Sequence, residues 1–570
     1  MKKVVIIGAV AAGPKVAARI KRLDPTWDVL VIDRDDMISY GGCGIPYYVG
    51  GDVNDLEGLR STSAHVIRDQ TYFKNVKGVE ILTRTEVVSI DRKGKTIRVR
   101  RLNDGQEEEI TYDKLVLATG STPVVPPLEG VTLPGVSVVA TLHHAKTIKD
   151  KIAAGQVSSA VVIGGGAIGL EMAEALTDLW GLETTLVEMA DQLLPSALGA
   201  DMALLVQNHM EEKDVRIRLR ERVTRIVGSA ESGVTAVETD KGTLPCELVI
   251  MAVGVRPNAA LAVQAGLTVG RAGGIVVDQQ MRTSDPDIYA GGDCVELPHL
   301  VSGQQVHMPL GSLANRQGRV IGTNIVRGGE RFKGTVGSFV VKVFDLGVAR
   351  AGLTVAQAAA AGFDPVHAVV VQADRAHFYP SMELMYMKLI ADRKTRRILG
   401  VEALGAQGDA VKARVDAVAA LMPGGADIAD ISNLEVTYAP PFASAMDIVN
   451  SAANSLENIL EGQQTPIDVM DFLSCFKKNG IKVIDVRSAV QSTPFVEKYG
   501  DRWINIPQED LACRIDEVPG DEPLLLICGS GPRSYEAQLL LRSHGIADTR
   551  NIQGGVGMVK RSDPAFMPQP

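Results

Sequence analysis

Cys43 stands among residues that would make its sulfur reactive. It lies in Ser39-Tyr-Gly-Gly-Cys-Gly-Ile-Pro-Tyr47, where the flanking glycines leave the sulfur accessible to another molecule. A packing cysteine normally stands in an apolar run, which this segment is not. The second position of a C-x4-C pair is occupied by Tyr48. Cys43 must therefore cycle through an external sulfur, as a mixed disulfide or persulfide, or through a sulfenate.

Cys528 begins a second reactive segment, Cys528-Gly-Ser-Gly-Pro-Arg533, after the apolar run 524–527 and before a helix expected over 535–543. Such a loop can aim backbone N–H groups and a helix N-terminus at one point, which stabilises a thiolate or persulfide. Arg533 adds a fixed positive charge. The other cysteines (246, 294, 475 and 513) lack such surroundings, and we expect them to pack. The wide spacing of the six cysteines predicts neither a disulfide framework nor a metal site.

A dinucleotide-binding pattern opens the chain. The β-branched run 4–7 ends at Gly8, a helix follows to Leu23, and a second strand over 29–32 ends at Asp33. Gly8 and Gly13 stand where the backbone would approach a pyrophosphate, and Asp33 stands where a carboxylate holds ribose hydroxyls. The middle glycine of G-x-G-x-x-G is replaced by Val10, so the motif alone is weak.

Two later segments complete this first site. The strand 115–117 runs into Ala118-Thr119-Gly120, and the segment 283–293 delivers Gly291, Gly292 and Asp293 to a ligand. In this order the motifs resemble the FAD site of the flavoprotein disulfide reductases that carry two dinucleotide folds. The resemblance implies FAD, bound by Gly8, Gly13, Asp33, Arg34, Ala118, Thr119, Gly120, Gly292 and Asp293.

A full G-x-G-x-x-G motif follows the strand 160–163 and opens a helix that runs to about residue 180. Glu188 ends the next strand, where a carboxylate accepts hydrogen bonds from ribose hydroxyls and repels a 2′-phosphate. NADH is therefore favoured, and the arginines at 220 and 222 leave NADPH open. The residues assigned to this cofactor are Gly164, Gly166, Gly169 and Glu188.

The Cys43 segment is similar to the S-F-x-N-C-G-x-P-Y block of coenzyme A-disulfide reductases and their NADH oxidase and persulfide reductase relatives. It departs from that block at Gly42, where the family usually has Asn. The segment 438–442 matches the family's Y-A-P-P-[YF] block, and 378–380 resembles its second tyrosine site. The resemblance implies a homodimer in which Tyr379 and Tyr438 serve the partner's thiolate, with the Tyr438 phenol donating a proton to the leaving thiol.

The resemblance also implies a coenzyme A site. Family members bind the CoA phosphates with the first helix, where Lys15, Arg19 and Arg22 form a cationic face. A solvated charged face is an equal alternative for these three residues. Ser39, at the start of the Cys43 block, is also assigned to the substrate. No metal site is expected.

The order strand, C-x4-R, helix resembles the rhodanese sulfurtransferases, as do 483–487 upstream and 551–555 downstream. Related phosphatase loops usually carry one more residue, so the six-residue loop favours sulfur over phosphate. A degenerate, purely structural rhodanese fold is the alternative. The resemblance covers about 1–455 for the reductase and 466–560 for the rhodanese domain.

The 570 residues allow about three to five domains. We predict an α/β chain with two Rossmann-like dinucleotide-binding domains, for FAD (1–150 and 246–325) and NAD (151–245). An α+β dimerisation domain (326–455), a linker (456–466) and a rhodanese-like α/β domain (467–562) follow. The Pro-rich tail is expected to be loose.

The composition is 45% hydrophobic and 22% charged with a net charge of −9, which argues against general nucleic-acid or anionic-membrane binding. No apolar run reaches the length of a membrane span, and we expect a reducing cytoplasm. The favoured function is NAD(P)H-dependent reduction of CoA persulfide, CoA disulfide or polysulfide, with sulfur delivered by the rhodanese domain. The alternatives are an NADH oxidase or peroxidase that cycles through a Cys43 sulfenate, and a non-catalytic flavin redox sensor.

Overall fold

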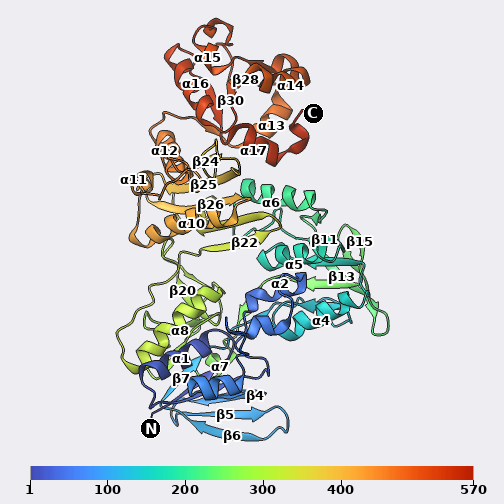
Figure 1. Ribbon diagram of the computed structural model, residues 1–570, viewed down its shortest axis with the longest axis vertical. Helices are drawn as coiled ribbons and strands as arrows, with labels where there is room; N and C mark the ends of the chain where they lie inside the picture. Colours follow the sequence, from blue (N-terminus) through green and yellow to red (C-terminus); the bar gives the residue numbers. More distant parts are fainter. Residues whose placement is uncertain (1, 569–570) are drawn as a thin grey trace. The chain divides into compact units, whose positions relative to one another are not determined.

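The computed structural model describes residues 2–568, with the side chain of Asn479 left aside. Two compact units form: residues 2–191 with 213–335, and residues 192–212 with 336–568. Figure 1 shows each unit as helices packed on sheets. No helix among the described residues is both long and apolar enough to span a bilayer.

The first unit contains a parallel sheet in the order β19-β7-β1-β2-β3. Its central strand β1 is fully apolar apart from its first residue, because it is covered on both faces. Helix α8 packs against α1, and each Cβ built at Gly318 or Gly322 would lie within 3.0 Å of an α1 atom. The elements are β1 (Lys3–Ile7), α1 (Ala12–Leu23), β2 (Asp28–Ile32), β3 (Glu80–Leu82), β7 (Lys114–Leu117), β19 (Ile288–Ala290) and α8 (Gly311–Val326).

A second parallel sheet repeats this arrangement in the order β12-β11-β10-β16-β9. An antiparallel three-stranded sheet accompanies each parallel one, β4-β5-β6 and β13-β14-β15. The elements of the second parallel sheet are β9 (Val136–Val138), α4 (Leu142–Ala153), β10 (Ser159–Ile163), α5 (Ala167–Asp178), β11 (Glu183–Val187), β12 (Arg216–Arg218) and β16 (Leu248–Met251). The antiparallel strands are β4 (Thr85–Asp91), β5 (Thr96–Arg101), β6 (Glu107–Thr111), β13 (Val223–Ser229), β14 (Gly233–Thr239) and β15 (Gly242–Pro245).

The second unit begins with an antiparallel sheet in the order β22-β23-β26-β25-β24, with α10 and α12 packed on it. The elements are β22 (Phe339–Val343), β23 (Leu346–Gly352), β24 (Pro365–Ala373), β25 (Leu384–Asp392), β26 (Ile398–Gly405), α10 (Gly408–Leu421) and α12 (Ile448–Leu460).

The segment 192–212, expected within the NAD domain 151–245, packs in the second unit. Its helix α6 (Ala200–Glu212) places Asp201 against Lys388 of β25, with both side chains buried and Nζ 2.9 Å from the carboxylate. Buried Arg350 donates to the carbonyls of Ser196 and Ala197 at 3.1 and 3.2 Å. Separation of these contacts would leave buried charges uncompensated, so they hold the segment to the second unit.

The chain ends in a parallel sheet in the order β27-β31-β30-β28-β29. The predicted fold class is thereby confirmed: parallel Rossmann-like sheets, an antiparallel sheet and a C-terminal parallel α/β domain. The elements are β27 (Pro466–Ile467), α13 (Val469–Asn479), β28 (Lys482–Asp485), α14 (Ala489–Tyr499), β29 (Trp503–Asn505), α15 (Gln508–Leu511), β30 (Leu524–Ile527), α16 (Pro532–Ser543), β31 (Thr549–Ile552) and α17 (Gly555–Ser562).

Two sequence expectations for this end of the chain differ from the structure. The first five residues of the expected linker 456–466 form the last turn of α12, where Leu456 is fully buried. The expectation of a loose tail is wrong as far as residue 568. Phe566 is buried against Phe472 and Phe476, and Lys498 donates to the carbonyls of residues 565–567. Residues 569–570 lie outside the described part of the chain.

Candidate functional site

The first glycine-rich loop lies at the carboxyl ends of β1 and β7. A Cβ at Gly8 would lie 2.1 Å from the Ala118 carbonyl oxygen, and one at Gly13 would lie 1.9 Å from the Gly8 carbonyl oxygen. Both positions therefore require glycine. Asp33 Oδ2 accepts the Ala9 N–H at 2.6 Å, and burial raises the pKa of Asp33.

The later motifs meet this loop at the same sheet edge. The Gly291 N–H donates to the Leu117 carbonyl at 3.0 Å, which sets the end of β19 beside β7. The carboxylate of Asp293 accepts the Ser121 hydroxyl at 3.2 Å, and burial raises the pKa of Asp293. The structure thus brings together Gly8, Gly13, Asp33, Ala118, Thr119, Gly120, Gly292 and Asp293, whereas the Arg34 side chain is exposed.

These residues fit FAD. The N-terminus of α1 has no side-chain cap and no acidic residue in its first turn, so within the described chain its N–H groups are available to a phosphate. A Cβ at Gly120 would meet no atom within 4 Å, which leaves open space beside the loop. Asp33 and Asp293 supply carboxylates for hydroxyl groups.

Asp35, Asp36 and His143 form a cluster of metal-compatible groups, the one such cluster in residues 2–568. His143 Nε2 lies 2.9 Å from Asp35 Oδ1 and 3.0 Å from Asp36 Oδ1. The ring therefore ties α4 to the loop that follows Asp33. Arg84 also pairs with Asp36 at 2.7 Å, so these carboxylates have protein partners.

The second glycine-rich loop repeats the first. A Cβ at Gly164 would lie 2.4 Å from the Ala252 carbonyl oxygen, and one at Gly169 would lie 1.9 Å from the Gly164 carbonyl oxygen. At Gly166 a Cβ would meet nothing within 4 Å. The Glu188 carboxylate accepts the Gly165 N–H at 2.7 Å, as Asp33 does for Ala9. The loop and the carboxylate fit the adenosine end of a dinucleotide.

Arg220 lies beside the loop that follows Glu188. Its N–H donates to the Ala190 carbonyl at 2.8 Å, and its exposed guanidinium lies 3.5 Å from Asp191. The side chain of Arg222 is exposed as well, next to Asp240. Arg220 is thus held by its backbone to the loop that follows Glu188, and its cationic side chain pairs with Asp191 of that loop.

Cys43 lies in a single turn, Gly42–Gly44, that leads into α2 (Ile45–Gly50). The residue is exposed, and a Cβ built at Gly311, the first residue of α8, would lie 3.6 Å from its sulfur. The packed surroundings of the sulfur and the charges of Glu171 and Asp293 raise the pKa of Cys43, and the Gly311 N–H opposes them. Elements of both dinucleotide sites thus converge on this thiol.

Glu171 and Gly311 are functional candidates that the sequence did not single out. Glu171 stands on α5, two residues after Gly169, and its carboxylate accepts the Tyr47 hydroxyl at 3.3 Å. Burial raises the pKa of Glu171 to about 7. Its place in the motif was visible in the sequence, but its approach to Cys43 depends on the packing of α2 against α5.

The cationic face of α1 continues onto α8. Arg19 Nε donates to the Thr323 hydroxyl at 3.1 Å, while Lys15 is half-buried and Arg22 is exposed. Burial and the neighbouring charges of Arg319, Arg22 and Arg327 lower the pKa of Arg19. Such crowding of cations is typical of a surface that binds anions. Ser39 does not join this face, because it is buried and its N–H donates to the Ala9 carbonyl at 2.8 Å.

In the second unit, Tyr379 and Tyr438 lie on two segments that Arg414 connects. The buried guanidinium donates to Asp447 at 2.9 Å and to the carbonyls of Asp374 and Phe442 at 3.0 and 3.1 Å. These segments expose large apolar side chains, namely Phe378, Tyr438, Phe442 and Met446. Such a patch is typical of a surface that another protein covers.

The Cys528 loop places one backbone N–H, a hydroxyl and a helix N-terminus at the sulfur. The sulfur is buried at the start of α16 and accepts the Gly531 N–H at 3.0 Å. The Ser534 hydroxyl lies 3.3 Å from the sulfur and 2.7 Å from Asn551 Oδ1. The Arg533 guanidinium folds over the loop, 3.5 Å from a Cβ built at Gly529. Helix α16 begins at Pro532, three residues before the sequence predicts, which brings its N-terminus directly to the sulfur.

All six cysteines are free thiols in the described chain. Cys246 and Cys294 are buried and Cys475 is half-buried, in keeping with the prediction that they pack. That prediction is wrong for Cys513, which is exposed because it follows α15 in a turn on the surface.

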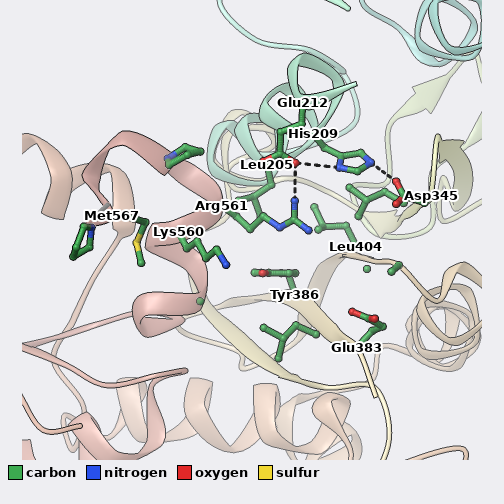
Figure 2. Close-up of a pocket in the computed structure, with 17 residues that line it drawn as sticks. Leu205, His209, Glu212, Asp345, Glu383, Tyr386, Leu404, Lys560, Arg561 and Met567 are labelled. Atoms are coloured by element: carbon green, nitrogen blue, oxygen red, sulfur yellow. Dashed lines mark hydrogen bonds and ion pairs between the residues drawn. The ribbon is translucent and has the colours of Figure 1, made fainter. Parts of the chain in front are cut away.

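A cavity of about 580 Å³ lies in the second unit between α6, β25 and α17. Figure 2 shows Lys560 and the Tyr386 hydroxyl pointing toward the same space, and Arg561 pairs with Glu212 at 3.2 Å. None of the sequence-predicted site residues lines this cavity.

Comparison with known proteins identifies the family of the chain. Residues 2–318 match the family described as pyridine nucleotide-disulphide oxidoreductase, and residues 338–449 match its dimerisation domain. The NAD(P)H coenzyme A polysulfide/persulfide reductase of Pyrococcus horikoshii is 35% identical over 446 residues, which cover 78% of this chain and 96% of that protein.

Two solved structures resemble the chain over nearly its whole length. A NAD-dependent persulfide reductase from A. fulgidus shares 38% identity with a TM-score of 0.92, covering 98% of this chain and 99% of that one. Reduced Bacillus anthracis CoADR-RHD shares 32% identity with a TM-score of 0.91, covering 100% and 99%. The family implies FAD and NAD(P)H as cofactors. The chain belongs to the pyridine nucleotide-disulphide oxidoreductase family, in its CoA-disulfide reductase and persulfide reductase group.

Proposed function

We propose that the protein is an NAD(P)H-dependent flavoenzyme that reduces CoA persulfide, CoA disulfide or polysulfide through Cys43 alone, supplied with sulfane sulfur by Cys528. The observation that carries the proposal is the exposed Cys43 thiol, whose sulfur lies against the start of α8 and whose pKa is raised by its packed surroundings and by the charges of Glu171 and Asp293 from the two dinucleotide sites. The names of the relatives from Pyrococcus, A. fulgidus and B. anthracis support the substrate class.

Asp33, Asp293 and the loops at Gly8 and Gly120 would hold FAD, and Glu188 with the loop at Gly164 would hold the nicotinamide dinucleotide. Bound FAD supplies a relay for the electron pair of NAD(P)H. Glu188 favours NADH because its carboxylate repels a 2′-phosphate. Arg220, beside the same loop, is the residue through which NADPH would be used.

Cys43 acts as the nucleophile toward the substrate. Its thiolate forms a new S–S bond to one substrate sulfur as the substrate's own S–S bond breaks, and an electron pair then cleaves the new bond. For a persulfide the balanced reaction is RSSH + NADH + H⁺ → RSH + H₂S + NAD⁺. The Gly311 N–H at the start of α8 stabilises the thiolate in both steps.

The CoA phosphates would bind the cationic face formed by Lys15, Arg19 and Arg22, extended by Arg319 of α8. Ser39 is buried beside the first loop, so it would contact only the part of the substrate that lies close to Cys43. Glycine at position 42 leaves the thiol more open than the asparagine that is usual in the family.

The enzyme works as a homodimer in which Tyr379 and Tyr438 serve the thiol of the opposite subunit. The dimerisation-domain match and the exposed patch around Phe378 and Phe442 support this assembly. The Tyr438 phenol would donate the proton that the leaving thiolate needs. A catalytically competent monomer, detected by light scattering under assay conditions, would contradict the assignment.

Cys528 loads sulfur from a thiosulfate-like donor. Its thiolate attacks the outer sulfur of S₂O₃²⁻ and releases SO₃²⁻. The resulting persulfide passes its outer sulfur to an acceptor thiolate. The Gly531 N–H, the N-terminus of α16 and Arg533 stabilise the anion at each stage.

The experiment that tests the proposal is anaerobic NADH oxidation with CoA persulfide, CoA disulfide and polysulfide in turn, while sulfide and free CoA are assayed. Turnover with at least one of these acceptors, at rates above those with oxygen or hydrogen peroxide, is expected. Faster turnover with oxygen or peroxide would identify an oxidase or peroxidase. No steady-state turnover with any acceptor would identify a redox sensor.

A further inference from the structure

The carboxyl ends of three neighbouring strands align along one edge of the C-terminal sheet. Strand β27 ends before Asp468, β31 ends before Gln553 and β30 ends before Cys528. The strands are parallel and adjacent in the order β27-β31-β30, so these three residues follow one another along the edge. The sulfur-carrying residue therefore shares an edge with a polar pair, the buried Gln553 and the half-buried Asp468.

This edge meets β24, one of the two edge strands of the antiparallel sheet. Gln553 Oε1 accepts the Val369 N–H at 2.7 Å, and Gln553 Nε2 donates to Asp468 Oδ1 at 2.8 Å. The same carboxylate oxygen lies 2.9 Å from His367 Nε2. Since an edge strand presents unpaired N–H groups, Gln553 satisfies one that would otherwise be buried without a partner.

Apolar packing continues along the strand at Val371. A Cβ at Gly554 would lie 3.0 Å from Val371 Cγ2, and one at Gly557 would lie 3.2 Å from Val371 Cγ1. His367, Val369 and Val371 alternate along β24, so one row of the strand meets the C-terminal domain at three successive points. The two glycines allow the turn after β31 to approach that row.

The segment that docks on β24 also shapes the sulfur loop. The Val556 N–H donates to the Cys528 carbonyl at 2.8 Å, and the Gly557 N–H donates to the Gly529 carbonyl at 2.9 Å. A Cβ at Gly555 would lie 2.4 Å from the same Cys528 carbonyl oxygen. Residues 553–557 thus contact both strand β24 of the antiparallel sheet and the backbone of Cys528 and Gly529.

We propose that Gln553 and Asp468 are positioning residues for sulfur delivery: they fix the Cys528 loop on strand β24, so that sulfur leaves Cys528 from a docked domain and not from a freely tethered one. This inference rests on the proposed sulfur delivery. The transfer of sulfur from Cys528 to the reductase depends on the docked position of the C-terminal domain. The separate reactions of Cys528 and of Cys43 do not depend on it.

The test compares three reactions of the full-length holoenzyme. The first is sulfur transfer from thiosulfate to cyanide, which needs only Cys528. The second is NADH oxidation with preformed CoA persulfide. The third is the coupled reaction, NADH-dependent sulfide release from thiosulfate and CoA. Gln553→Glu keeps the acceptor for the Val369 N–H but places a second carboxylate against Asp468, which should undock the domain.

Gln553→Glu should retain the first two activities within about twofold and lose the coupled activity by about tenfold or more, because a misplacement of about 1 Å can cost roughly 100-fold. Adding Asp468→Asn supplies an amide donor to the new carboxylate and should restore the coupled rate. Gln508→Ala is the matched control, since the Gln508 amide contacts Glu536 on the surface of the same domain.

Unchanged coupled turnover in Gln553→Glu would overturn the inference, as would failure of the double variant to recover. Equal loss of all three activities would also overturn it, because the residue would then serve folding alone. A wild-type enzyme that performs the first two reactions but not the coupled one would contradict the proposed sulfur delivery itself. That failure is seen without any variant, so it is distinguishable from a failure of docking.

Discussion

Arg414 and Asp447 form a buried ion pair, with Nη2 2.9 Å from the carboxylate, and the same guanidinium holds the carbonyls of the two tyrosine-bearing segments. The pair therefore links the segment of Tyr379 to that of Tyr438. Both side chains are nearly inaccessible, at 8% and 3% exposed. Removal of one partner would leave an uncompensated buried charge.

We predict that Arg414→Gln destabilises the folded protein by about 3 kcal/mol and weakens dimerisation, because Asp447 loses its partner and the two segments separate. Chemical denaturation and light scattering measure the two effects. Arg396→Gln is the control, since Arg396 lies 3.4 Å from Glu457 with both side chains exposed, and its loss should cost less than about 1 kcal/mol. Similar costs for the two variants would contradict the role of Arg414.

Glu171→Gln should lower the pKa of Cys43, because the Glu171 carboxylate disfavours a nearby thiolate. The pKa of Glu171 is about 7, so its charge is present above pH 7 and absent well below it. The alkylation rate of Cys43 should therefore rise about threefold at pH 8.5 and should not change at pH 5.5.

The protein is labelled with iodoacetamide, and mass spectrometry measures how fast the peptide that contains Cys43 becomes labelled. Glu183→Gln serves as the control, because Glu183 is an exposed residue of the same domain that pairs with Arg216. A rate increase of the same size at both pH values would show that the substitution acts on access to the thiol and not on its charge.

Positions 42 and 44, on either side of Cys43, should respond differently to a side chain. A Cβ at Gly42 would meet only Tyr40, at 3.8 Å, whereas one at Gly44 would lie 2.4 Å from Leu59 Cδ2. Gly42→Asn should leave stability within about 0.5 kcal/mol. Gly44→Ala should destabilise the protein by about 1 kcal/mol, because the terminal methyl of Leu59 must shift to admit the new Cβ. A destabilised Gly42→Asn variant would contradict this account of the turn.

Cys528→Ser should abolish NADH oxidation supported by thiosulfate and CoA, because serine cannot carry a sulfane sulfur. Turnover with preformed CoA persulfide should stay within about twofold of the wild type, since that reaction needs only Cys43. Parallel NADH assays with the two substrates measure both effects. If neither reaction changed, the C-terminal domain would play no part in delivery.

The sequence predicts the parts of the site that depend on local backbone chemistry. The loops at Gly8 and Gly164 need glycine next to a strand end, and the Cys528 loop needs its glycines before a helix, so residue types and spacing reveal all three. The approach of Gly311 to Cys43 could not be predicted, because it depends on the packing of a helix that begins about 270 residues later. The placement of α6 likewise depends on the buried pair of Lys388 and Asp201, which no local pattern indicates.

The tail illustrates the same limit. Its prolines predict a loose segment, yet Phe566 packs into an aromatic cluster with Phe472, Phe476 and Tyr499. An apolar residue in a polar tail has a fixed place only if a cavity elsewhere accepts it. Sequence spacing does not contain that information.

The most direct test of the central claim is anaerobic turnover of Cys43→Ser with NADH and CoA persulfide, with NADH loss, sulfide and free CoA measured together. The wild type should release one sulfide and one CoA for each NADH consumed. The variant should keep its FAD and the NADH-driven bleaching of flavin absorbance, because the cofactor-binding residues are untouched, and should lose sulfide release by about 100-fold or more. Sulfide release near the wild-type rate in the serine variant would contradict the assignment of Cys43 as the redox centre.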